Sequence, residues 1–255
     1  MTAYTQPTHQ PPLYSNTEPL LGSHDAEAHD APKFDGPVVQ TALAIRMAFV
    51  RKVYTVLSMQ LCLTATMSTV FICSPSIQRF THSNAWLTFL SLFLSIAAML
   101  ALFWKRESYP VNMYLLAVFT TFESYAVANL VTYYDSSTVA MATIITMGVF
   151  IGLTLFTMQS SYDFSHWGTY LYVTLWITIV AGFVAMFFPF TRWIQMGYAI
   201  LGTILFSAYI LYDTHMIMQR LSADEYILAA VSLYLDVINL FLSILRLLNA
   251  VNSDS

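Results

Sequence analysis

Seven apolar runs dominate the sequence, and each is close to the roughly 20 residues that a helix needs to cross about 30 Å of hydrocarbon. The runs are Val53–Ile72, Ala85–Trp104, Val111–Val131, Val139–Met158, Tyr170–Phe188, Ile194–Asp213 and Tyr226–Leu248. Because lipid offers no partner to an exposed backbone N–H or C=O group, we expect every run to cross as an α-helix. The connections are short, so we predict an all-α membrane protein with one seven-helix bundle over residues 46–250.

The composition also indicates a membrane protein. Only 9% of the residues are charged and 57% are hydrophobic, whereas a soluble domain usually carries about 25% charged residues. Most of the surface therefore faces lipid, and the bilayer is the first expected partner. The sequence contains no nucleotide, metal-cluster or haem motif, so we expect no cofactor and no nucleic-acid partner.

Residues 1–45 have a different character. They hold six of the nine prolines, and their charges are Glu18, Asp25, Glu27, Asp30 and Asp35 against Lys33 alone. Such a segment buries too little apolar surface to offset the entropy of ordering it, so we predict a disordered acidic tail. Residues 251–255 form a short polar C-terminus.

The tail contains one binding motif. Pro11, Pro12 and Tyr14 belong to a Pro-Pro-x-Tyr sequence of the kind that docks as polyproline II in aromatic WW grooves. The implied partner is a WW-domain adaptor of a ubiquitin ligase. The alternative is a chance match in a proline-rich segment.

Lysine and arginine placement predicts the orientation in the membrane. With the N-terminus in the cytoplasm, that side receives six basic residues and the other side three. The excess favours a cytoplasmic N-terminus and a C-terminus on the opposite side. The six are Arg46, Arg51, Lys52, Lys105, Arg106 and Arg220.

Three carboxylates lie inside or at the end of an apolar run, namely Glu123, Asp213 and Asp236. A charge at the centre of a bilayer costs about 2.5–3.5 kcal/mol on insertion scales, so such residues face the bundle interior and are functional by default. For Asp213 the alternative is a carboxylate at an interfacial helix end. Glu123 either lines a pathway or hydrogen-bonds to a neighbouring helix.

The seventh run carries a polar stripe. Its members recur at intervals of 4, 3, 4 and 3 and so share one helical face: Ser232, Asp236, Asn239, Ser243 and Arg246. We predict that the stripe faces a wet cavity, with an inter-helix hydrogen-bonded seam as the alternative. Asp213 ends its run while Asp236 is central, so the two carboxylates meet only if the sixth helix extends further or the seventh starts deeper.

Several segments resemble the Bax inhibitor family, also called Lifeguard or transmembrane Bax-inhibitor-motif proteins. Residues Leu233–Leu248, LYLDVINLFLSILRLL, resemble its C-terminal signature. Ser207–Thr214 resembles the family's sixth helix, Arg51–Ser58 the start of its first, and Thr121–Tyr125 its third-span pattern in the Lifeguard branch. The resemblance covers about residues 46–250.

This resemblance implies a seven-helix bundle with a central last helix, a calcium leak through intracellular membranes, and restraint of cell death. It also implies a pH-sensing aspartate pair at Asp213 and Asp236, with Arg106 as the arginine that pairs with the first aspartate. A family glutamate aligns with Ser95, so Glu123 is expected to supply that charge from another helix. The implied residence is the endoplasmic reticulum, with the vacuole or lysosome, the Golgi and mitochondria as alternatives, and cell-death regulators are the implied partners.

A mechanism follows from these residues. Two carboxylates in one low-dielectric site cannot both ionise cheaply, so they share a proton. Calcium prefers several oxygen ligands, and a transient site of Asp213, Asp236, Asn239 and water suits a leak. Glu123, Ser232 and Ser243 complete the predicted pore lining. Our hypothesis is that protonation of the pair shifts a closed–open equilibrium.

Other functions fit parts of the same pattern. The main alternative is a non-conducting scaffold that acts on cell-death or stress-signalling partners. Intramembrane aspartyl proteases also carry two membrane aspartates, and Tyr212-Asp213 fits their first motif. However, the residues Leu233-Tyr234-Leu235 replace the Gly-x-Gly before their second aspartate. We therefore expect no enzymatic activity.

Overall fold

A computed structural model describes residues 37–188, 191–222 and 225–252, and within these ranges it contains helices and no strand. The elements are α1 (Pro37–Cys73), α2 (Pro75–Ser83), α3 (Trp86–Trp104), α4 (Val111–Val131), α5 (Ser136–Gln159), the 3-10 helix η1 (Phe164–Trp167), α6 (Gly168–Phe187), α7 (Arg192–Gln219) and α8 (Tyr226–Asn252). The Pro11-Pro12-Leu13-Tyr14 motif lies outside the described residues.

The seven predicted spans are confirmed. Among the described residues, seven helical segments are long and apolar enough to cross a membrane, and each contains most of one predicted run. Helices α1, α5, α7 and α8 are longer than their apolar runs because further residues continue them past the hydrocarbon. This difference matters most for α7, which continues to Gln219.

Helix α1 begins earlier than the sequence suggested. Residues 37–45 are helical, whereas the disordered tail was predicted to reach residue 45. Pro37 stands at the first helical position, where its missing N–H costs nothing and its fixed φ suits a helix. Neither proline nor glycine follows before residue 46, so nothing interrupts the helix.

Helix α2 is a short element that the sequence analysis did not predict. Pro75 ends α1 and opens a new nine-residue helix. Its His82 ring stacks on Tyr133 at 4.3 Å between centroids, and His82 Nε2 lies 2.8 Å from Thr132 Oγ1. These contacts attach α2 to the connection between α4 and α5.

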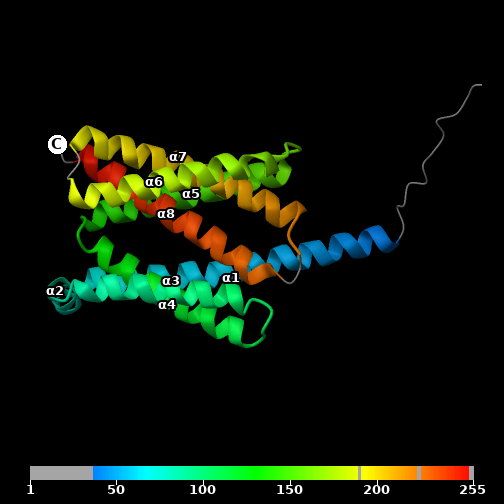
Figure 1. Cartoon of the computed structure of the whole chain (residues 1–255), viewed down its shortest axis with the longest axis horizontal. Coiled ribbons are helices and arrows are strands. Elements are labelled where there is room, and N and C mark those ends of the chain that lie inside the picture. The colour runs from blue at the N-terminus through cyan, green and yellow to red at the C-terminus, as the bar shows by residue number, and fades with distance from the viewer. Residues whose placement is uncertain (1–36, 189–190, 223–224, 253–255) are drawn as a thin grey trace, which may run out of the picture.

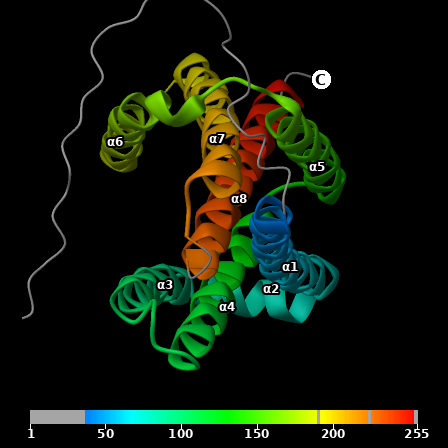
Figure 2. The same cartoon turned by 90° about the vertical axis from the view of Figure 1, so that its right-hand side faces the viewer.

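Helix α8 lies at the centre of the bundle (Figure 2), as the family resemblance implied. It packs most extensively on α7 and also contacts α1, α5 and α4. In contrast, α3 packs mainly on α4, and α6 packs on α7 and η1. Two thirds of the α8 span is buried, against about a tenth of the α6 span, so the last helix is the core element.

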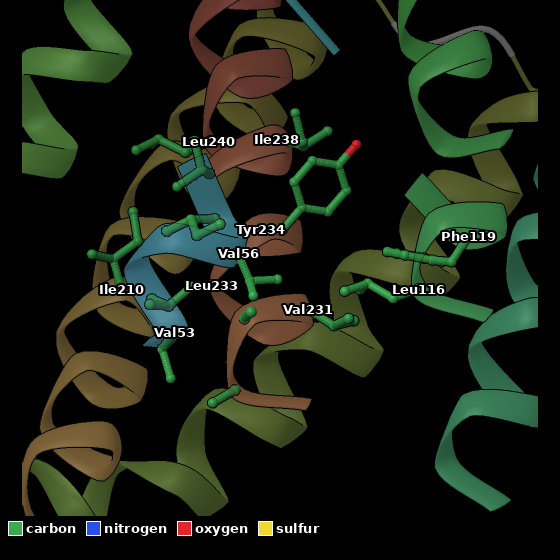
Figure 3. Close-up of a cluster of buried hydrophobic side chains, with 14 of the residues drawn as sticks. Val53, Val56, Leu116, Phe119, Ile210, Val231, Leu233, Tyr234, Ile238 and Leu240 are labelled. Atoms are coloured by element: carbon green, nitrogen blue, oxygen red, sulfur yellow. The ribbon is translucent and has the colours of Figure 1, made fainter. Parts of the chain in front are cut away.

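Aromatic and branched side chains surround α8. Figure 3 shows Tyr234 of α8 in a buried cluster to which α1 contributes Val53 and Val56 and α4 contributes Leu116 and Phe119. Tyr234 is fully buried, and its ring meets that of Phe119 edge to face at 5.9 Å. This geometry suits the quadrupoles of two aromatic rings.

Two glycine positions show where helices approach closely and where they do not. A Cβ atom at Gly202 of α7 would lie 2.5 Å from Ser243 Oγ of α8, so these backbones meet in a tight seam. Gly148 and Gly152 of α5 have the Gly-x-x-x-Gly spacing that lets two helix backbones approach closely. No such approach occurs within the described chain, because both are exposed and a Cβ at either meets no atom within 4 Å.

The first described residues of α1 and the last described residues of α8 lie at opposite ends of the bundle (Figure 1). This arrangement agrees with an odd number of spans. The end where α1 begins is called the basic end below, because alternation of the spans brings six basic residues there. They are Arg46, Arg51, Lys52, Lys105, Arg106 and Arg220.

Candidate functional site: a buried carboxyl pair

The length of α7 places Asp213 beside Asp236. Asp213 lies six residues before the end of α7 at Gln219, and Asp236 lies ten residues after the start of α8 at Tyr226. At 1.5 Å per residue these positions are about 9 and 15 Å from the neighbouring helix ends. The sixth span therefore extends further than its hydropathy indicated, which is one of the two conditions for the carboxylates to meet.

The two carboxyl groups lie close enough to interact with each other and to share a proton. Because an ionised carboxylate only accepts, one member of a hydrogen-bonded pair must carry the proton that is donated. Asp236 is 6% exposed, and its Oδ2 atom is buried with no partner among the described residues. Asp213 is only partly buried. The pair thus has an inner and an outer member.

A cavity of about 410 Å³ reaches the outer member from the basic end. Its walls come from the end of α3, the end of α7 and the start of α8. Polar or charged lining is supplied by Arg106, Asp213, Arg220, Glu225 and Ser232. The remaining walls are mainly apolar. The cavity lining includes Asp213 and not Asp236, so the pair lies at the inner limit of the cavity.

Arg106 lies in the wall of this cavity, but it does not pair with Asp213 in this conformation. Its Nε atom is 3.5 Å from Oε1 of its neighbour Glu107, and both side chains are at least half exposed. Such an exposed pair contributes little stability, so the guanidinium can exchange partners at low cost. Arg106 and Asp213 therefore line the same cavity, but they do not form an ion pair with each other.

The polar stripe of α8 divides into two parts. Ser232 lines the cavity and Asp236 forms the carboxyl pair. Further along, Asn239 Nδ2 donates to Leu235 O at 2.8 Å, and Ser243 Oγ donates to Asn239 O at 2.8 Å and packs against Gly202. Ser232 is thus the member of the stripe that lines the cavity, whereas Asn239 and Ser243 form hydrogen bonds within α8 and not the inter-helix bonds of the alternative.

Glu123 lies away from the carboxyl pair. Ser95 Oγ of α3 donates to Glu123 Oε2 of α4 at 2.6 Å, and neither residue lines the cavity. Of the two interpretations of Glu123, this structure shows the hydrogen bond to a neighbouring helix. The contact also places the Glu123 carboxylate beside Ser95. Position 95 is where the family resemblance expects a glutamate.

The sequence analysis missed a buried hydroxyl cluster on the other side of α8. Tyr234 Oη is 2.9 Å from Thr64 Oγ1, which is 2.7 Å from Ser124 Oγ, and Gln60 Nε2 donates to Thr120 Oγ1 at 3.0 Å. Residues 234 and 236 point in nearly opposite directions, because two helical steps turn the chain by about 200°. Gln60 and Thr64, spaced four apart in an apolar run, were the available signal.

No group of three or more His, Cys, Asp or Glu side chains within the described ranges has the geometry to hold a metal ion. The carboxyl pair supplies four oxygens at most. Calcium usually takes six to eight oxygen ligands. Any calcium ion at the pair would therefore need water or backbone oxygens in addition.

Comparison with known proteins places these features in a family. The sequence model of the family described as "Inhibitor of apoptosis-promoting Bax1" matches residues 46–253. The chain is 42% identical over 238 residues to mouse "Protein lifeguard 4", covering 93% of this chain and 99% of that protein.

Two further relatives come from a yeast and a virus. "Bax inhibitor 1" of Schizosaccharomyces pombe is 38% identical over 248 residues, which cover 95% of this chain and 93% of the relative. The "Golgi anti-apoptotic protein" of Vaccinia virus (strain Lister) is 39% identical over 219 residues, covering 86% and 92% respectively. The similarity thus includes both aspartate-bearing helices and nearly all of the bundle.

Proposed function

The chain belongs to the Bax inhibitor family of anti-apoptotic, multi-pass membrane proteins, and on that premise we propose that it is a pH-sensitive calcium leak channel of intracellular membranes. In this proposal the leak regulates calcium stores and thereby restrains cell death. The observation that carries the proposal is a pair of neighbouring carboxyl groups at the inner limit of a cavity that opens at the basic end.

The described conformation corresponds to the closed state of this channel. The cavity ends at Asp213, and beyond Asp236 the α7–α8 seam is tight at Gly202 and Ser243. Conduction through this route requires α7 and α8 to separate beyond the pair. A proton shared by the two carboxyls favours their contact, and its loss leaves two like charges in one low-dielectric site.

Deprotonation therefore pushes the pair apart and supplies calcium with oxygen ligands from Asp213 and Asp236. Water and Asn239, one helical turn further along α8, extend the proposed path. Arg106 then opposes full opening, because its guanidinium is within the same cavity and binds the ionised Asp213. The same Arg106 contact gives a route by which the open state closes again.

The cellular setting is part of the proposal. The N-terminus faces the cytoplasm, since the basic end carries six of the basic residues that flank the spans. We place the protein in the endoplasmic reticulum. The viral relative is named for the Golgi, so Golgi residence is the alternative. The relatives are named for cell death and not for a reaction, and we assign no catalytic role to the aspartates.

The test is calcium influx into liposomes that contain the purified protein and a calcium dye, recorded from about pH 5 to pH 8. Asp213→Asn and Asp236→Asn each remove one carboxylate while keeping the side-chain shape. Asp135→Asn is the matched control, because Asp135 is an exposed carboxylate at the start of α5. Glu123→Gln tests the third membrane carboxylate.

The wild type and Asp135→Asn should show the same pH-dependent influx, and both aspartate-pair variants should flatten it. Glu123→Gln should keep the pH response, because Glu123 does not line the cavity. An unaltered pH profile in both pair variants would refute gating by the pair. Absence of influx at every pH in the wild type would favour the scaffold function instead.

A further inference from the structure

The end of α7 carries no glycine cap. Many helices end on a glycine in the left-handed region, which satisfies the last carbonyl groups. Here Arg220 is the C-cap, with φ of −120°, and the described residues contain no glycine with positive φ. The backbone N–H groups of Arg220 and Leu221 both donate to Met216 O, at 2.8 and 2.9 Å, and contacts from other elements add to this local closure of the turns that follow Asp213.

The first such contact comes from α1. Arg46 Nη1 donates to Leu221 O at 2.6 Å across 175 residues of sequence, in a partly buried position. A cationic donor at the carbonyl end of a helix complements both the unpaired carbonyls and the helix dipole. Six residues further along α1, Lys52 Nζ lies 3.4 Å from the centroid of the Tyr226 ring at the start of α8.

The second contact comes from the segment between α5 and η1. Asp163 Oδ1 is 3.0 Å from His215 Nε2, and Asp163 Oδ2 is 3.4 Å from Arg220 Nη2. Asp163 Oδ1 also accepts from Ser165 N at 2.9 Å, so one carboxylate caps η1 and binds α7 at two positions. The next residue, Phe164, is 3% exposed and meets the His215 ring edge to face.

The charge of Asp163 is steady over the physiological range. Hydrogen bonds from Ser165, with His215 and Arg220 nearby, hold the pKa of Asp163 well below its ordinary value of 3.8. A carboxylate with a lowered pKa loses its contribution only as the pH falls through that lowered pKa. The Asp163 carboxylate therefore stays ionised from pH 5 to pH 8.

We propose that Arg46 and Asp163 are positioning residues that anchor the end of α7 and thereby hold Asp213 against Asp236. The inference rests on the proposed function, in which contact between the two carboxyls keeps the leak closed. A helix transmits a displacement along its axis, and Asp213 is within two turns of the anchored end. Releasing either anchor should therefore loosen the pair without changing either aspartate.

Two measurements test the anchors on the full-length protein in lipid. Hydrogen–deuterium exchange of residues 214–221 reports the end of α7, with residues 196–206 of the same helix as an internal reference. Calcium influx at neutral pH reports the leak. The variants are Arg46→Gln and Asp163→Ala. Arg51→Gln is the matched control for charge on α1, and Asp135→Asn is the control for an exposed carboxylate.

Arg46→Gln and Asp163→Ala should each raise exchange in residues 214–221 by roughly tenfold, as expected for the loss of a charge-assisted hydrogen bond. Residues 196–206 should be unchanged, and influx should exceed that of the wild type. Asp163→Asn should show a smaller effect, because it keeps the acceptor for Ser165 and His215. Arg46→Lys should restore part of the protection, since it keeps a cationic donor.

Unchanged exchange in both anchor variants would overturn the inference. Raised exchange with influx equal to the wild type would also overturn it, since the anchors would then fix the helix end without acting on the pair. A wild type that conducts no calcium would refute the proposed function itself. In that case the exchange results alone would decide whether the two anchors hold α7.

Discussion

Replacement of Gly202 by alanine tests the seam that closes the bundle beyond the carboxyl pair. The added Cβ would lie 2.5 Å from Ser243 Oγ and 3.3 Å from Ser243 Cβ, whereas ordinary contacts begin at 3.4 Å. Ser243 Oγ is fixed by its hydrogen bond to Asn239 O, so relief requires breaking that bond or moving α7 by nearly 1 Å. Overpacking of this kind costs about 1–3 kcal/mol.

Alanine is the better helix former by up to about 1 kcal/mol, so the net destabilisation should be roughly 1–2 kcal/mol. Thermal unfolding in detergent, followed by tryptophan fluorescence, should show this as a Tm lower by several degrees. Ser243→Ala removes the clashing oxygen, so the double variant should recover part of the loss and reveal a coupling of about 1 kcal/mol.

The control is Gly148→Ala, where no atom lies within 4 Å of the new Cβ. This variant should be as stable as the wild type or slightly more stable, because only the helix propensity changes. If Gly202→Ala matched Gly148→Ala in Tm, or if its effect were simply additive with that of Ser243→Ala, the reasoning from the seam would be refuted.

Three further predictions concern contacts away from the seam. Tyr234→Phe removes the hydroxyl that meets Thr64 and should lower the free energy of unfolding by about 0.5–1.5 kcal/mol, measured by thermal unfolding. Ser95→Ala leaves the Glu123 carboxyl without its donor, so it should cost more, about 1–3 kcal/mol, and Glu123→Gln in the same background should restore part of the Tm. Gly168→Ala would bring a Cβ to 2.8 Å from Tyr212 Oη, and protease sensitivity of the α5–α6 connection should rise as α6 loosens from α7.

The seven spans could be predicted because insertion into lipid depends on the hydropathy of each segment alone. The same argument ended the sixth helix at Asp213, where the apolar run stops. The helix continues over Thr214, His215 and four more residues, and Asp163 contacts this extension at His215. The depth of Asp213 in its helix is thus a tertiary property that a hydropathy profile does not contain.

For a related reason, the sequence predicted which side chains share one face of a helix but not which side chains meet across two helices. Helical spacing identifies a polar face, and it placed Ser232 and Asp236 together correctly. It does not give the rotation of neighbouring helices, so it did not separate the part of the stripe beside the cavity from the part beside Gly202. The Ser95–Glu123 contact likewise depends on how α3 and α4 are rotated about their axes relative to each other, so helical spacing did not predict it.

The central position of α8 has a consequence for how the protein is made. The ribosome releases this helix after the other six spans, yet α1, α4, α5 and α7 all pack on it. Until α8 is inserted, the earlier helices must stay in the bilayer with the faces that will cover α8 still exposed, and Thr64 lacks the Tyr234 hydroxyl that meets it in the finished bundle. A chain that terminates before α8 would therefore leave six inserted helices without their common core, and membrane quality control should recognise such a product by these exposed faces.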